Sequence, residues 1–373
     1  MASNLSNVAK SSNASNVGIS GFSVYVPPHR VNLEDWCSWT GANWNKVSAV
    51  VGRSFRVKGP GQSLYTMAAS SVLRLIERFD IDPNSVGMLI LGTESSTDNA
   101  AGAVILRGMI DEGLEQKGLP RLARDCEVPE IKHACLGGIY GLKQALRYLE
   151  VDGQGRKAIV VSADIAEYER GSTGEPTQGA GAVAMLLEEN PRILQIDVRQ
   201  SGSASRYRGP DFRKPFQRFM EPEYAKGVHK VHDFPVFNGK YSTACYLDEV
   251  LSALDAMRGK SPTSEAPLSE SVDRVFFHRP YRKIPTTAWG MSVLLEMTLN
   301  EKGREELRDL CSQSDVSFDS VCSELERSRD LFAATKEGRL DDDPFPNTMR
   351  VLRAFRKAER HDELVDRKLS LGA

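Results

Sequence analysis

Hydrophobic residues in the first half of the chain follow two different spacings. Nearly unbroken apolar runs at residues 17–26, 86–91 and 157–163 predict strands, and the last two have the pattern of strands buried on both faces. Over residues 63–78 and 103–112, apolar residues recur at every third or fourth position, which is typical of helices. Strands that alternate with helices in this way predict an α/β fold.

One cysteine falls at a predicted junction between a strand and a helix. A short mixed run over residues 126–131 leads to Cys135, and helical spacing over residues 139–149 follows it. The N-terminus of a helix favours a thiolate, and Gly137 and Gly138 allow close approach of substrate or backbone. The pattern is that of a nucleophile elbow with sulfur in place of oxygen. A buried, unreactive cysteine that opens a helix would give the same local pattern.

Other ionisable residues also follow predicted strands. Glu94 comes directly after the strand over 86–91, and His278 ends a strand predicted over 272–277. Open α/β sheets place their chemistry in loops at strand ends, although a solvated loop carboxylate is the better interpretation of Glu94 taken in isolation. The two segments share a polar lead, an apolar strand and an ionisable residue. This similarity fits a molecule made of two similar halves.

Composition excludes several classes of protein. The chain has 373 residues, 40% of them hydrophobic and 26% charged, as in a globular enzyme, and a net charge of −2 gives no argument for nucleic acid or a membrane. Six cysteines without zinc-site spacing predict free thiols in a reducing compartment and no metal site. No apolar run is long enough to span a bilayer, and the Ser/Asn-rich start lacks the apolar core of a signal peptide.

Three further segments carry organisational signals. Residues 175–187 form a glycine-rich turn that leads into a strand, and no helix follows it as a dinucleotide-binding loop would require. Residues 53–62 are rich in Gly, Pro and basic side chains and predict an ordinary connection. Residues 201–240 are polar and aromatic with four prolines, which predicts an excursion or lid. The chain from residue 288 onward is helical in pattern and highly charged.

Several stretches together resemble 3-hydroxy-3-methylglutaryl-CoA synthase, a condensing enzyme of the thiolase superfamily. They follow the family's order, and together they are far more specific than any one alone. The matching stretches are GTES (92–95), HACLGG (133–138), VVSADIAEY (160–168), EPTQGAGAVAML (175–186), FPVFNGKYS (234–242) and FFHRPYRK (276–283).

The resemblance implies a thiolase-like α/β fold with two similar halves and mixed sheets in α/β/α/β/α layers. After a disordered tail over residues 1–17, the first half would cover 18–192 and carry Glu94 and Cys135. The second half would cover 193–373 and carry His278, with the 201–240 excursion and a charged helical C-terminal region. This half would be incomplete at its C-terminal end.

The resemblance also implies roles for individual residues. Cys135 would attack acetyl-CoA and hold the acetyl group, Glu94 would remove a methyl proton, and His278 would position acetoacetyl-CoA. Four further residues would contact the substrate or CoA: Lys283, Asp164, Gly179 and Tyr168. Lys283 would be directed at the CoA phosphates or would equally be a solvated surface lysine, and Asp164 would equally serve as a structural cap. CoA thioesters would be substrates and no separate cofactor would be needed. The implied setting is the mevalonate pathway in the cytoplasm, and superfamily analogy suggests a homodimer.

The chain departs from the family in two places. Asn238 stands where many members have Asp, which puts the role of that loop in doubt, and we interpret His133, His229 and His232 as structural. The family's Gly-Asn-x-Tyr segment and the glycine-serine-rich strand after it do not appear. Either the sequence is a truncated piece, or a separate polypeptide supplies those strands and the enzyme is split.

Three alternative functions share much of this pattern. A polyketide β-branching synthase uses the same Cys, Glu and His on substrates held by acyl carrier protein, and the basic residues over 206–218 suit either a carrier phosphopantetheine or CoA. A ketoacyl synthase III-like enzyme would need a second His or an Asn pair in place of Glu94. An inactive scaffold subunit of a heteromeric condensing complex is the alternative outside the enzymes.

Overall fold

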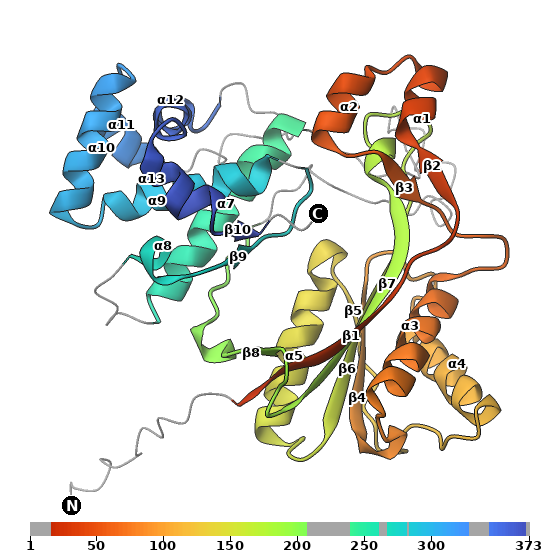
Figure 1. Cartoon of the computed structure of the whole chain (residues 1–373). Helices are drawn as coiled ribbons and strands as arrows, with labels where there is room; N and C mark the ends of the chain where they lie inside the picture. Colours follow the sequence, from red (N-terminus) through yellow and green to blue (C-terminus); the bar gives the residue numbers. More distant parts are fainter. Residues whose placement is uncertain (1–15, 207–238, 261–266, 282, 328–342, 371–373) are drawn as a thin grey trace, which may run out of the picture. The chain divides into compact units, whose positions relative to one another are not determined.

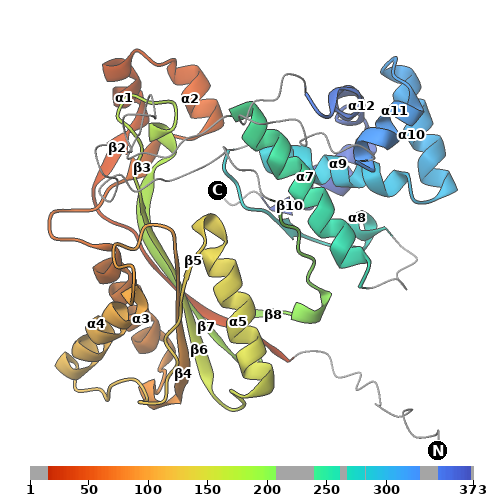
Figure 2. The same ribbon diagram turned by 180° about the vertical axis from the view of Figure 1, so that it is seen from behind.

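The computed structural model describes residues 16–206, 239–260, 267–281, 283–327 and 343–370 (Figures 1 and 2). Its contacts divide the chain into two compact units, each with its own hydrophobic core. Unit 1 comprises residues 1–36, 54–167 and 178–199, and unit 2 comprises residues 37–53, 168–177 and 200–373. The predicted tail over 1–15, most of the 201–240 excursion, and residues Asn238, His229 and His232 lie outside the described residues.

A mixed β-sheet with strand order β5-β4-β6-β7-β1-β8 forms the centre of unit 1. Strands β4, β5 and β6 are parallel, whereas β7 is antiparallel to β6 and β1, and β8 is antiparallel to β1. The bounds are β1 (Val17–Tyr25), β4 (Val86–Thr93), β5 (Glu130–Lys132), β6 (Lys157–Ala166), β7 (Gly179–Glu189) and β8 (Leu194–Gln195). Every residue of β4 is buried, in agreement with its unbroken apolar run.

Three helices cover this sheet, and Figures 1 and 2 show them on its two faces. Helices α3 (Leu64–Phe79) and α4 (Gly102–Gln116) pack into the larger core on one face, and α5 (Gly137–Val151) packs into the smaller core on the other. A capping box fixes the start of α3: Ser63 Oγ accepts the Thr66 N–H at 3.2 Å, and Thr66 Oγ1 accepts the Ser63 N–H at 2.9 Å.

Strands β2 and β3 form a second, two-stranded sheet in unit 1. Strand β3 (Ser54–Arg56) pairs antiparallel with β2 (Arg30–Asn32), so the prediction of an ordinary connection over 53–62 was wrong for its first residues. The Arg56 guanidinium donates hydrogen bonds to the carbonyls of Pro27 and Pro28 at 3.2 and 3.0 Å, which fixes this small sheet to the segment that follows β1. Between the two strands the chain forms α1 (Leu33–Thr40) and α2 (Trp44–Val50).

Unit 2 is mainly helical in the part that the structure describes. Besides α2, its α-helices in the described part of the chain are α7 (Gly239–Arg258), α8 (Leu268–Ser271), α9 (Ile284–Met297), α10 (Glu301–Gln313), α11 (Phe318–Leu325), α12 (Pro346–Phe355) and α13 (Glu359–His361). Helix α9 is buried at every position except Thr286 and forms the centre of the core. Two short parallel strands, β9 (Val275–Phe276) and β10 (Leu369–Ser370), complete the unit.

Three predicted strands are shorter than their apolar patterns. The strand predicted over 126–131 is reduced to β5 and one bridge between Met88 and Glu127, because Pro129 between them has no N–H to donate. Apolar residues at positions 193, 194, 196 and 198 also predict a strand, but only β8 forms there, and a 3₁₀ turn over Val198–Gln200 follows it. The strand predicted over 272–277 is only β9.

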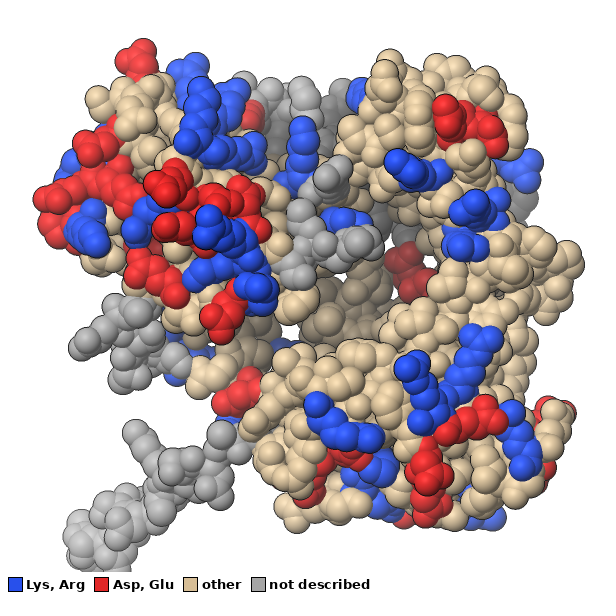
Figure 3. Space-filling model, viewed as in Figure 1, with Lys and Arg blue, Asp and Glu red and all other residues tan. Residues whose placement is uncertain are grey.

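Acidic and basic side chains are interleaved on the face seen in Figure 3, as expected for a chain with a net charge of −2. No helix in the described part of the chain combines the length and apolarity needed to cross a bilayer.

Candidate functional site

The carboxyl ends of three parallel strands lie side by side at one end of the unit 1 sheet. Strand β4 lies between β5 and β6, with Gly92 opposite both Ile131 and Ser162. Glu94 follows β4, Cys135 comes shortly after β5, and Asp164 lies near the end of β6. The structure therefore brings these three predicted residues to the same end of one sheet, as expected for chemistry at strand ends.

Glycines let the start of α5 lie directly against these strand ends. A Cβ at Gly92 would come within 2.4 Å of the Gly138 nitrogen, and a Cβ at Gly137 within 2.7 Å of the Ile131 carbonyl oxygen. A Cβ at Gly138 would lie 2.1 Å from Ser162 Oγ. Any side chain at these positions would push the helix away from the sheet, so the glycines fix the place of the residues that open α5.

Cys135 lies in a 3₁₀ turn, Ala134–Leu136, that leads directly into α5. It is exposed, whereas the other five cysteines are buried free thiols. Ala134 has a φ of +41°, a left-handed conformation that costs a residue with a Cβ about 1 kcal/mol. The turn thus presents the thiol to the outside at the positive end of a helix of 15 residues, which favours its anion. An inert, buried cysteine does not fit this geometry.

Asp164 holds the loop that carries Glu94. Its Oδ1 accepts the backbone N–H groups of Glu94 at 2.8 Å and Ser95 at 3.1 Å, and the hydroxyls of Ser95 at 2.7 Å and Thr93 at 3.0 Å. Ser95 Oγ in turn accepts the Ile165 N–H at 2.8 Å, which connects the loop to β6 a second time. These contacts leave the Glu94 side chain half-buried, with its Oε2 atom fully buried.

The environment of Asp164 favours its protonated form. Burial raises the pKa of this carboxyl above its ordinary value, and the nearby charge of Glu94 acts in the same direction. The hydrogen bonds from Glu94, Ser95 and Thr93 oppose this shift without cancelling it. A buried carboxyl group with a raised pKa is a common feature of functional sites.

A second network fixes the continuation of the Glu94 loop. The ammonium group of Lys132, at the end of β5, donates a hydrogen bond to the Ser96 carbonyl at 2.7 Å. The buried hydroxyls of Ser96 and Tyr65 are 3.0 Å apart, and Tyr65 accepts the Asp98 N–H at 3.1 Å. The loop after β4 is therefore attached to α3, β5 and β6, so the direction of the Glu94 side chain is set by several independent contacts.

His278 and Lys283 belong to unit 2. The His278 carbonyl accepts the Tyr246 hydroxyl at 2.7 Å, and the hydroxyls of Thr243 and Tyr281 are 2.8 Å apart. Helix α7 thus holds the backbone on both sides of residues 279–280, and the His278 side chain is exposed. Burial raises the pKa of Tyr246 to about 12, so this hydroxyl remains a hydrogen-bond donor at neutral pH. Lys283 is exposed and immediately precedes α9.

Tyr168 and Gly179 lie in different units. Gly179 opens β7 in unit 1, opposite Ala166, and has no positive φ that would demand glycine. Tyr168 is half-buried in unit 2, and a Cβ at Gly174 would come within 2.7 Å of its ring, so glycine there makes room for the tyrosine. The substrate-binding roles of Tyr168, Gly179, Lys283 and Asp164 stay predictions.

Sequence reasoning did not single out Ser95, Thr93 or Tyr246. Ser95 and Thr93 stand in the GTES stretch beside Glu94, and hydroxyl residues that flank an ionisable residue at a strand end are a usable signal. Tyr246 gave no such signal, because its contact with the His278 carbonyl joins residues 32 positions apart on a helix and a loop.

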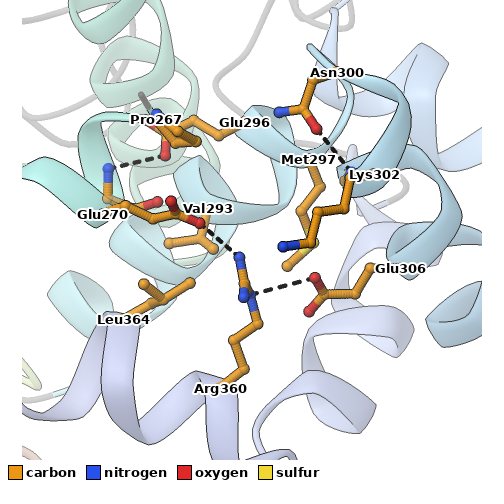
Figure 4. A pocket seen from close by; sticks show the side chains of 12 residues that line it. Pro267, Glu270, Val293, Glu296, Met297, Asn300, Lys302, Glu306, Arg360 and Leu364 are labelled. Carbon is orange, nitrogen blue, oxygen red and sulfur yellow. Dashed lines mark hydrogen bonds and ion pairs between the residues drawn. The ribbon is translucent and has the colours of Figure 1, made fainter. Parts of the chain in front are cut away.

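Unit 2 also contains a cavity of about 200 Å³ between α8, α9, α10 and α13 (Figure 4). Arg360 extends into it and pairs with Glu270 at 2.7 Å and Glu306 at 3.3 Å. On its wall, the buried Glu296 pairs with Arg258 at 2.6 Å and accepts the Ser269 N–H at 3.0 Å. These ion pairs involve five helices, α7, α8, α9, α10 and α13. None of the predicted site residues lines the cavity, so we interpret it as structural.

Among the described residues, no group of three or more His, Cys, Asp or Glu side chains could hold a metal ion. The chemistry available at the strand ends of unit 1 is that of an exposed thiol and a half-buried carboxylate, which suits acyl transfer and proton abstraction.

The mixed sheet, the cysteine at the start of α5 and the carboxylate after β4 define a thiolase-like α/β protein, and comparison with solved structures agrees. MvaS in complex with 3-hydroxy-3-methylglutaryl coenzyme A is 28% identical with a TM-score of 0.67, covering 94% of this chain and 70% of that one. The curacin biosynthetic pathway HMG synthase, also solved with donor acyl carrier protein, is 26% identical with a TM-score of 0.60, covering 73% and 60%.

Sequence comparison leads to the family. The family described as hydroxymethylglutaryl-coenzyme A synthase N terminal matches residues 13–191. Hydroxymethylglutaryl-CoA synthase A of Dictyostelium discoideum is 30% identical over 336 residues, which are 86% of this chain and 62% of that protein. The Enterococcus faecalis hydroxymethylglutaryl-CoA synthase is 29% identical, covering 79% and 67%. The chain is therefore similar to the hydroxymethylglutaryl-CoA synthase family over most of its own length, and it spans less than two thirds of the length of the Dictyostelium relative.

Proposed function

We propose that this chain carries the catalytic residues of a hydroxymethylglutaryl-CoA synthase, an acyltransferase that condenses acetyl-CoA with acetoacetyl-CoA. One observation supports the proposal most: Cys135 and Glu94 follow neighbouring parallel strands whose ends are held together by Gly92, Gly137 and Gly138. A nucleophile and a base at neighbouring strand ends are what a two-step acyl transfer and carbon–carbon bond formation require.

In the first step, the Cys135 thiolate attacks the carbonyl carbon of acetyl-CoA. The carbon–sulfur bond to CoA breaks, the CoA thiolate leaves, and an acetyl thioester forms on Cys135. The N-terminus of α5 favours the attacking thiolate, and its outward N–H groups can stabilise the oxyanion of the tetrahedral intermediate. The exposure of Cys135 gives the thioester of a large substrate access to the sulfur.

In the second step, Glu94 removes a proton from the acetyl methyl group. The resulting carbon nucleophile attacks the ketone carbon of acetoacetyl-CoA, and the alkoxide takes a proton back from Glu94. Asp164 holds the Glu94 backbone in one position. His278 donates a hydrogen bond to the acetoacetyl group, and water then hydrolyses the thioester to Cys135 and releases the product.

The decisive experiment is intact mass spectrometry of the full chain after incubation with acetyl-CoA. An added acetyl group in the wild type and in Glu94→Gln, but not in Cys135→Ala, is the expected result. Adding acetoacetyl-CoA should then discharge the wild-type acetyl group and leave Glu94→Gln acetylated. An acetyl group that persists in Cys135→Ala, or condensation by Glu94→Gln at the wild-type rate, would overturn the proposal.

The same assay separates CoA substrates from carrier-bound substrates. The resemblance to the curacin HMG synthase extends the test to acetoacetyl groups on acyl carrier protein. The predicted basic stretch over 206–218 lies mostly outside the described residues, so the structure gives no preference between the carriers. Condensation only on the carrier protein would reassign the chain to polyketide β-branching.

Partners and location are proposals of the same kind. We propose a homodimer, a cytoplasmic location and a role in the mevalonate pathway, supported by the resemblance to the family. A separate polypeptide that supplies further strands is also proposed. Native mass spectrometry of the active complex tests both assemblies: a second, smaller chain in the complex supports the split enzyme, and a complex of one chain type contradicts it.

A further inference from the structure

Half of β1 forms an open edge of the unit 1 sheet. Strand β8 pairs only with Gly18 and Ile19, whereas residues 21–25 pair with β7 on one side and with no described strand on the other. Alternate residues of this stretch therefore direct N–H and C=O groups outward, which is the feature that an added strand recognises. Figure 1 shows β1 along this edge of the sheet.

The open edge carries exposed apolar side chains on one face. Phe22, Val24 and Val26 are 39%, 51% and 51% exposed, and their spacing of two places them on the same side of the strand. Gly21 and Tyr25 lie on the opposite side, since a Cβ at Gly21 would meet Phe79 of α3 and Tyr25 packs with the core under α3. A row of apolar residues beside free backbone groups marks an interaction site.

On the α3 side, arginines border the same edge. Arg74 lies over the Tyr25 ring at 5.1 Å, and Arg78 lies over the Phe79 ring at 5.9 Å. Neither arginine has an ion pair with a described residue. Glu77, the acidic residue between them, is already paired with Lys117 at 2.7 Å. Figure 3 shows Lys and Arg atoms over the α3 side of this face.

An open groove of about 740 Å³ lies here between β1 and α3, and we call it the β1 groove. The side chains that line it are Phe22, Ser23, Val24, Arg74, Glu77 and Arg78. Its charge is positive on balance, because neither arginine has an ion-pair partner among the described residues, whereas its one glutamate is paired with Lys117. Edge strands are often protected by charges and prolines. Here the strand itself carries no charge over residues 21–25, and the arginines come from α3, so they repel a basic strand and attract an acidic one.

We propose that the β1 groove binds an extended acidic segment of a partner protein as an additional β-strand. The added strand pairs its backbone with residues 21–25. Its apolar side chains alternate along the face of Phe22 and Val24, and its carboxylates alternate along the other face toward Arg74 and Arg78. The occupant is thus a segment of about six residues in which acidic and apolar residues alternate, at about 3.3 Å per residue. This site is separate from the residues of the proposed function.

Fluorescence anisotropy with labelled six-residue peptides and the full chain tests the proposal. A peptide that alternates Glu and Val should bind, and a peptide that alternates Lys and Val should not. N-methylation of alternate amides in the Glu/Val peptide removes backbone donors without changing charge, and it should weaken binding at least about tenfold. Equal binding of the N-methylated peptide, or of the Lys/Val peptide, would overturn the proposal.

Variants of the chain provide the second half of the test. Arg74→Glu combined with Arg78→Glu should weaken the Glu/Val peptide at least about tenfold and should allow the Lys/Val peptide to bind. Arg124→Glu, a substitution at another exposed arginine of unit 1, is the matched control and should leave both affinities unchanged. An equal loss in the control would show general charge attraction and contradict a defined groove. If the double variant failed to fold, the peptide comparison on the wild type would still decide.

Discussion

The Glu94 backbone N–H donates to Asp164 Oδ1 at 2.8 Å, which connects the loop after β4 to the neighbouring strand β6. Three more donors, from Thr93 and Ser95, share the same oxygen. The position of the proposed base thus depends on a carboxyl group that has no need to contact substrate.

Replacing Asp164 tests this positioning. Asp164→Ala leaves the Glu94 and Ser95 N–H groups without their acceptor, at a cost of about 1–3 kcal/mol for each buried donor. We expect Cys135 still to acetylate, and condensation to fall about 100-fold because the base is displaced. Asp164→Asn keeps an oxygen at the Oδ1 position and should retain most activity. Equal loss in Asn and Ala variants would indicate that the charge, rather than the acceptor, matters.

The raised pKa of Asp164 predicts a pH dependence of stability. Because the folded state binds this proton more tightly than the unfolded state, its contribution favours folding at low pH. This contribution is lost as pH rises from the ordinary value of 3.8 through the higher folded pKa, and it is constant above that. Urea unfolding of wild type and Asp164→Asn across this interval measures it. The stability of wild type relative to the variant should fall with rising pH, and a rise would contradict the assignment.

Gly92 should tolerate no side chain. Gly92→Ala places a methyl group 2.4 Å from the Gly138 nitrogen, so α5 must move and we expect a loss of about 3 kcal/mol and of Cys135 acetylation. Gly108→Ala is the control, because Gly108 is an exposed position of α4 with open space around its Cα. That variant should gain about 0.5–1 kcal/mol through helix propensity. Chemical denaturation and intact mass measure both effects.

The buried ion pair between Glu296 and Arg258 should be important for unit 2. The Glu296 side chain is only 4% exposed, so Glu296→Ala removes one of the two carboxylates that pair with Arg258, the other being Asp255. It also leaves the Ser269 N–H without its acceptor, and it should cost about 3 kcal/mol. The exposed pair of Glu301 and Arg308 provides the comparison, and Glu301→Gln should change the free energy of unfolding by less than about 1 kcal/mol. Similar losses in both variants would contradict a special role for burial.

Tyr246→Phe separates the two steps of the proposed reaction. It removes the hydrogen bond to the His278 carbonyl and should cost about 1 kcal/mol of stability, because a neutral hydrogen bond contributes little net free energy. Acetylation of Cys135 should continue at the wild-type rate, since Tyr246 and Cys135 belong to different units. The KM for acetoacetyl-CoA should rise. An unchanged KM would show that Tyr246 does not position His278.

Sequence patterns predicted the elements of unit 1 well where burial was uniform. Strand β4 is apolar at nearly every position and buried throughout, and α3 shows one apolar face and a capping serine. The strand-end positions of Glu94, Cys135 and Asp164 followed from these elements. Local patterns did not predict the limits of β5, because Pro129 interrupts the ladder, or the role of Asp164, because its four donors come from residues 69 to 71 positions away.

Helix α9 has no solvent-facing side along almost its entire length. A helix of this kind cannot form a stable structure before its neighbours surround it, since most of its stabilisation comes from packing. Assembly of unit 2 is therefore a concerted event around this segment, and amphipathic helices such as α10 and α12 contribute one face each to enclose it. Evolutionary drift in unit 2 has room on those outer faces and very little along residues 284–297.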